Sequence, residues 1–222
     1  MIPVERIEPP DGFEENVRAK GLAWIAGQRQ PINKFQPYWT WCEPYLHDAF
    51  RGRCGWAAMW ITSGWVEHFV SQTECVRRAQ PELAYDWYNY RYVMPELNSS
   101  KKRWRPVLDP FDVKPGWFRI HLPTFHLVMT DAIPPEYRPL ATETLVGLGL
   151  DKSVKLLRIR RKWMARYLEG KIQITALDDD FPQLSEAIRA LLEAPDADLS
   201  EPQREYRAEI IARRQAAGVS VP

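Results

Sequence analysis

The segment RCGWAAMWITSGWVEHF, residues 53–69, constrains the fold most, because it holds two apolar runs rich in Trp, Ile and Val on either side of the turn at 62–64. Apolar runs of this kind that flank a glycine-containing turn predict a hairpin of two short antiparallel strands. The second run ends on Glu67 and His68. This pair is either an ordinary polar strand end or part of an active site.

Length and composition limit the alternatives. At 222 residues, with 45% hydrophobic and 27% charged residues, the chain is expected to form one globular unit, and charges interrupt every apolar run before it could span a membrane. The first residues do not resemble a secretory signal, so we expect a cytoplasmic protein. Although the net charge is +1, residues 51–105 carry nine Lys/Arg against five Asp/Glu, and residues 178–222 carry five against ten. A polyanion would therefore bind to the middle of the chain.

The rest of the chain has a coarse pattern of its own. Residues 70–93 show no clean period and predict a long loop, after which Pro95 suits the first position of a short helix. Runs at 117–122 and 125–129 predict a second hairpin. The remaining segments predict helices, near residues 14–28, 44–50, 134–151, 152–171, 178–194 and 200–217. The last of these is charged almost all round, which is typical of a solvated terminal helix, with projection toward a partner as the alternative.

The helix that begins at Pro95 could bring further polar groups to the end of the first hairpin. If it crosses back over the strands, Asn98 faces Glu67 and His68, and Lys101 and Lys102 follow on the same side. A hard divalent cation such as Mg²⁺ needs few protein oxygens and takes the others from water and phosphate. Histidine, with an ordinary pKa of about 6.5, can accept a proton from water at neutral pH.

The segments RCGWAAMWITSGWVEHFVSQT, AYDWYNYRYVMPELNSSK and VLDPF together resemble an HNH endonuclease, which has the ββα-metal fold. The resemblance implies a catalytic set in which His68 is the general base and Asn89 braces the loop by hydrogen-bonding backbone. It also implies that Glu67 and Asn98 bind Mg²⁺ or Mn²⁺. Glutamate stands where aspartate is commoner in the family, which leaves the metal geometry open.

Many HNH proteins carry two C-x-x-C pairs that bind a structural zinc ion. The equivalent positions here are Cys54, Ala57, Met94 and Leu97, so three of the four ligands are missing. We expect no structural zinc, and apolar packing in its place.

The fold class that follows is α+β, with a small ββα-metal core embedded in N- and C-terminal helices. We divide the chain into a helical lead (1–50), the core (51–112), a hairpin and helical part of the same domain (113–195) and a charged terminal helix (196–222).

The expected function is metal-dependent hydrolysis of DNA phosphodiester bonds, with RNA not excluded. The prokaryotic subgroup that the chain resembles implies a role in antiphage defence or restriction, beside an ATPase partner. A non-catalytic subunit that binds the ATPase or nucleic acid is the alternative. Lys101, Lys102 and Arg105 either contact phosphate or form a solvated helix face. Most tryptophans are expected in the core: Trp39, Trp56, Trp60, Trp65, Trp104 and Trp163.

Overall fold

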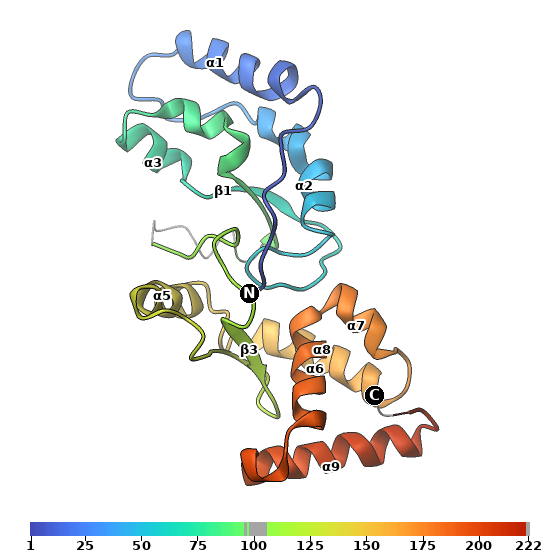
Figure 1. Cartoon of the computed structure of the whole chain (residues 1–222). Helices are drawn as coiled ribbons and strands as arrows, with labels where there is room; N and C mark the ends of the chain where they lie inside the picture. Colours follow the sequence, from blue (N-terminus) through green and yellow to red (C-terminus); the bar gives the residue numbers. More distant parts are fainter. Residues whose placement is uncertain (96, 98–105, 221–222) are drawn as a thin grey trace.

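The computed structural model of the chain describes residues 1–95, 97 and 106–220. Within them the protein mixes helices with two small antiparallel sheets of two strands each. Figure 1 shows the N-terminal helices and the first sheet at one end of the molecule, and the second sheet with the C-terminal helices at the other, with the N-terminus where the two parts meet. The mixed α and β character agrees with the predicted α+β class, while the ββα-metal core stays a prediction.

The first sheet pairs β1 (Trp65–His68) with β2 (Tyr90–Val93), in a register that sets Trp65 opposite Val93 and His68 opposite Tyr90. The predicted hairpin between the two halves of residues 53–69 is therefore wrong. Its first half makes only an isolated bridge, between Arg53 and Trp60. The reason is that this half folds back on itself, with the Cys54 amide donating to the Met59 carbonyl, and it serves the core instead of a sheet.

The predicted long loop is also wrong in part, because the chain between the strands is largely helical. It contains α3 (Gln72–Arg77), the 3-10 turns Pro81–Tyr85 and Trp87–Asn89, and then β2. Ser71 caps the N-terminus of α3, because its side chain accepts a hydrogen bond from the Glu74 amide at 3.2 Å.

Glu74 gives α3 a pH-dependent stability. Hydrogen bonds from Arg77 and then Arg78 lower the pKa of Glu74 to about 2, against 4.5 ordinarily. A depressed pKa stabilises the fold above the unfolded pKa, and that contribution disappears as the pH falls from about 4.5 to about 2. We expect Glu74→Gln to lower the urea midpoint at pH 7, with the gap to wild type closing at acid pH. Glu82→Gln, at an exposed carboxylate nearby, is the control. A difference in urea midpoint that does not change with pH, or an equal difference for Glu82→Gln, would contradict this role of Glu74.

The second sheet confirms the second predicted hairpin. It pairs β3 (Phe118–His121) with β4 (His126–Met129), with His121 opposite His126. Most of the predicted helices are also present, although the one predicted at 178–194 is preceded by a separate short helix and interrupted at Phe181. Besides α3 and the two 3-10 turns given above, the helices of the described residues are η1 (Glu14–Arg18), α1 (Ala19–Ala26), η2 (Tyr38–Cys42), α2 (Glu43–Ala49), η5 (Pro135–Tyr137), α5 (Arg138–Gly147), α6 (Val154–Leu168), α7 (Ile174–Asp180), α8 (Pro182–Glu193), η6 (Asp196–Asp198) and α9 (Glu201–Ala216).

The terminal helix α9 lies against the molecule, so the alternative of a projecting helix is wrong. Ile210 is fully buried, and the guanidinium of the buried Arg214 donates to the Tyr167 carbonyl of α6 at 2.7 Å. Figure 1 shows α9 along the end of the molecule beneath α8. One face is thus apolar enough to pack, while the remaining charges stay in water.

Buried apolar side chains form one cluster that includes residues from all four predicted segments, from Met1 to Ile210. The boundaries between those segments stay a prediction. Among the tryptophans, Trp56 is fully buried and its indole donates to the Leu108 carbonyl, but Trp60 and Trp65 are 39% and 54% exposed. The expectation of a core position is therefore wrong for these two, because Trp60 lies in the isolated bridge to Arg53 and Trp65 is the first residue of β1, in a sheet of only two strands. No described helix is long and apolar enough to cross a membrane.

Candidate functional site

His68 is the last residue of β1 and is 6% exposed. Its Nε2 lies 2.9 Å from the Ala84 carbonyl oxygen, and its ring meets the rings of Trp39 and Tyr90 edge to face at 4.6 and 5.3 Å. A carbonyl oxygen can only accept, so Nε2 carries the hydrogen and the lone pair of the neutral ring is on Nδ1. The fold therefore fixes both the orientation and the tautomer of this imidazole.

Glu67 precedes His68 and is 7% exposed. Side chains alternate between the faces of a strand, so Glu67 lies on the face of its partner Arg91, and His68 lies on the face of Tyr90. An ion shared by Glu67 and His68 can thus sit only beyond the end of the strand, where both side chains can reach around it. The structure confirms their place at a strand end, and it is the end at which Asn89 enters β2.

Asn89 joins the two strands to the intervening segment. Its Nδ2 donates to the carbonyls of Val70 at 3.0 Å and Leu83 at 2.8 Å, and its Oδ1 accepts from the Val70 amide at 2.6 Å. These are the backbone hydrogen bonds that the resemblance to HNH nucleases implies. Because the side chain is committed to backbone, Asn89 acts by positioning the chain around His68, and its place in a catalytic set stays a prediction.

Arg91, the strand partner of Glu67, forms a buried ion pair with Asp109 that could not be predicted from the sequence. The side chain of Arg91 is 2% exposed, and its Nε and Nη2 both donate to the Asp109 carboxylate, with 2.7 Å between Nε and Oδ1. Nη1 donates to the carbonyls of Tyr88 and Tyr90. The guanidinium also lies over the rings of Phe69 and Phe111, at 4.9 and 4.1 Å.

This pair gives the LDPF segment a structural role, because its Asp109 binds Arg91 and its Phe111 stacks on the same guanidinium. The resemblance includes LDPF without assigning it a contact. An aspartate before a Pro-Phe pair is the one local signal, and nothing in it identifies a partner eighteen positions earlier.

Four predicted site residues, Asn98, Lys101, Lys102 and Arg105, lie outside the described residues, as does Trp104. Their proximity to His68 stays a prediction. The backbone is helical at Pro95 and Leu97, directly after β2, as the prediction of a helix at this point requires. Among the described residues, no group of three or more His, Cys, Asp or Glu side chains is placed to hold a metal ion.

The four positions that the resemblance equates with zinc ligands are all buried. Cys54, Ala57, Met94 and Leu97 are each at most 4% exposed, and the Met94 amide donates to the Cys54 sulfur at 3.4 Å. Burial raises the pKa of the Cys54 thiol, which disfavours the thiolate that a metal would need. Packing of these four side chains was expected; the absence of zinc stays a prediction.

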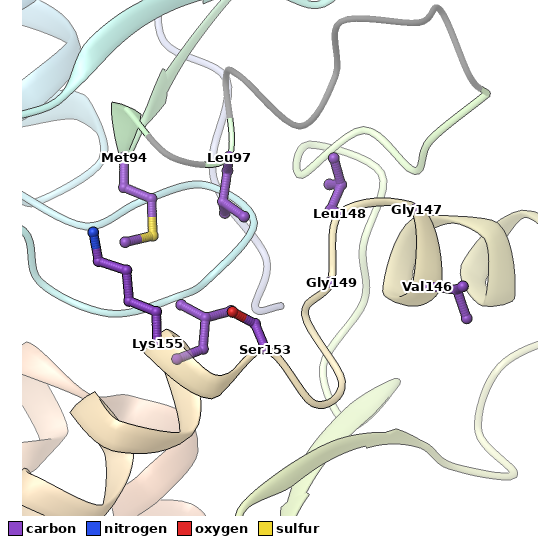
Figure 2. Close-up of a pocket in the computed structure, with 9 residues that line it drawn as sticks. Met94, Leu97, Val146, Gly147, Leu148, Gly149, Ser153 and Lys155 are labelled. Carbon is purple, nitrogen blue, oxygen red and sulfur yellow. The ribbon is translucent and has the colours of Figure 1, made fainter.

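A cavity of about 280 Å³ opens beside two of these positions. Met94 and Leu97 line one side, and the turn between α5 and α6 with Ser153 and Lys155 lines the other (Figure 2). The cavity thus lies between the segment that follows β2 and the beginning of α6.

No protein-family model, curated protein sequence or solved structure matches this chain.

Proposed function

We propose that the protein is an HNH-type endonuclease that hydrolyses phosphodiester bonds in DNA. The observation that carries the proposal is His68 at the end of β1, with Nε2 donating to the Ala84 carbonyl and the lone pair of its neutral ring on Nδ1. A base held in one tautomer by a backbone carbonyl is suited to take a proton from a water molecule. Asn89 supports this arrangement by tying residue 70, just beyond the strand, to the start of β2.

The donor set is compatible with a hard divalent cation. Mg²⁺ or Mn²⁺ takes carboxylate oxygens, needs one or two of them and keeps several waters, so Glu67 would supply one ligand and Asn98, outside the described residues, another. When bound, the cation supplies stabilisation of the charge on the phosphate and the leaving oxygen. The work of His68 is to accept the proton of the attacking water, and that of Asn89 is to hold the chain in place.

A second candidate is a non-catalytic subunit of the same fold that binds an ATPase or nucleic acid. The burial of both Glu67 and His68, at 7% and 6% exposure, favours it, because buried polar groups at a strand end also occur as purely structural features. The two candidates differ in chemistry, so a single cleavage assay separates them.

The assay is conversion of supercoiled plasmid to nicked or linear DNA by the full chain, in Mg²⁺, in Mn²⁺ and in EDTA. We expect cleavage in at least one metal and none in EDTA. Because the near-neutral net charge limits the phosphate neutralisation that the chain can supply, the same assay is repeated with the product of any ATPase gene found beside its own. The defence or restriction role that we propose requires such a partner to stimulate cleavage. Absence of cleavage under every condition would favour the non-catalytic subunit.

A further inference from the structure

Helix α6 carries a line of basic side chains that the proposed active site does not use. Arg158, Lys162 and Arg166 are exposed and follow one another at intervals of four residues, so they lie along one side of the helix. We call these three residues the α6 basic face. Leu156, Arg160 and Met164 are buried, and each precedes a member of that face by two residues, which at 100° per residue is nearly the opposite side.

The packing of α6 explains why this line faces water. The buried side rests on the core, where Arg160 donates to the carbonyls of Phe125 and Leu150. On the other side, Arg158, Lys162 and Arg166 form no ion pair with any carboxylate of the described residues, whereas nearby Lys171 pairs with Glu169 at 2.7 Å. The three cations thus form a concentrated positive charge in a chain of net charge +1, and Glu169 acts on only one of them, Arg166.

The charge pattern is unfavourable for the isolated helix. Like charges four residues apart repel each other, and the first turn of α6 has no acidic residue to complement the helix dipole. A solvated helix gains nothing from this arrangement, but a bound polyanion compensates it.

Geometry favours duplex DNA as that polyanion. Arg158 and Arg166 are eight residues apart, or about 12 Å along the helix, a length over which a duplex presents roughly seven phosphates. The beginning of α6 lies beside the end of the β1–β2 sheet that is opposite His68, because Lys155 lines the same cavity as Met94, which follows β2 (Figure 2). From Tyr90, opposite His68, to Met94 is a path of four residues, or about 13 Å of strand.

We propose that the α6 basic face binds the phosphate backbone of duplex DNA in a sequence-independent way, and that the duplex runs from α6 past the Val93 end of the β1–β2 sheet toward His68. The inference rests on the proposed nuclease function and names the surface that its substrate occupies. Phosphate contacts of this kind give affinity and position without base recognition.

The test is equilibrium binding of the full chain to a fluorescent 30-base-pair duplex in EDTA, which prevents cleavage, at several salt concentrations. The variant is Arg158→Gln, Lys162→Gln and Arg166→Gln together. The matched control is Lys20→Gln, Arg29→Gln and Lys34→Gln, which removes three exposed charges at the other end of the molecule. We expect the α6 variant to bind about 10- to 500-fold more weakly at 0.1 M salt, and the slope of log K against log salt to fall by about one per side chain removed. The control should keep the wild-type slope.

Folding is checked by the thermal midpoint, which should equal or exceed that of wild type because the substitutions remove repulsion within α6. An α6 variant that keeps the wild-type slope, a wild type that does not bind the duplex, or stronger binding to duplex RNA than to DNA would each overturn the proposal. Binding and cleavage are read separately. If wild type cleaves plasmid and the α6 variant binds DNA as wild type does, only this inference is wrong. If wild type binds DNA through α6 but never cleaves it, only the nuclease proposal is wrong.

Discussion

Replacing His68 by glutamine should lower the rate of metal-dependent DNA cleavage by about 10²- to 10⁴-fold, the range that a general base contributes. Glutamine places an amide nitrogen near the position of Nε2, so it can still donate to the Ala84 carbonyl and keep that hydrogen bond. It has no group that accepts a proton from water at neutral pH. The substitution thus separates the chemical role of His68 from its structural role, which His68→Ala would not do. Initial rates of plasmid nicking measure the effect.

The matched control is His47→Gln, an imidazole in α2 whose side chain is 44% exposed and which no proposed step uses. It should cleave at the wild-type rate. Both variants should show the circular dichroism spectrum and thermal midpoint of a folded protein. A lower cleavage rate of His68→Gln can then not be explained by unfolding. If His68→Gln cleaves as fast as wild type, another residue is the base and the proposed mechanism is wrong.

The position of His68 at a strand end could be predicted because the residues next to it in the sequence indicate a strand that ends there. The run from Trp65 to His68 is apolar and ends in ionisable residues, which is typical of a strand that leaves the core. The order of His68, Asn89 and the helical start at Pro95 was predictable for the same reason, since each depends on residues close in sequence. The structure confirms these placements for the residues that it describes.

The partner of β1 could not be predicted, because its sequence lacks the usual signal. All four residues of β2 are buried, Arg91 included, so its charged residue interrupts the continuous apolar run that is typical of a fully buried strand. Residues 53–61 mimic a strand because they are apolar. The apolar composition of this segment instead reflects the burial of Cys54 and Trp56, in a tight fold of the chain where Ala58 has a φ of +53°. Hydrophobic content alone therefore identified the wrong strand partner.

Replacing Asp109 by alanine should destabilise the protein by about 3 to 5 kcal/mol, the usual cost of leaving one partner of a buried ion pair uncompensated. Arg91 would keep its hydrogen bonds to the Tyr88 and Tyr90 carbonyls but lose both donations to carboxylate. Burial lowers the pKa of Arg91 and the Asp109 hydrogen bond opposes that shift, so this carboxylate stabilises the buried charge. Urea unfolding followed by tryptophan fluorescence measures the loss.

Asp112→Ala is the matched control, because its side chain is 57% exposed and meets Arg6 at 3.5 Å. An exposed pair is worth about 0 to 1 kcal/mol, so this variant should unfold nearly as wild type does. A loss for Asp109→Ala no larger than that for Asp112→Ala would contradict the role assigned to the pair. The double variant Arg91→Met, Asp109→Leu removes both charges and should recover much of the stability, since an apolar replacement leaves no buried charge.

The double variant also tests how the pair relates to the site. Arg91 lies opposite Glu67 on the same face of the sheet, so the Arg91 charge acts on the carboxylate proposed to bind the metal. If the pair serves stability alone, the double variant should recover folding and cleavage together. If Arg91 also positions Glu67, the recovered fold should need a higher Mg²⁺ concentration for half-maximal cleavage than wild type does. A titration of cleavage rate against Mg²⁺, performed on variants of equal urea midpoint, distinguishes these outcomes.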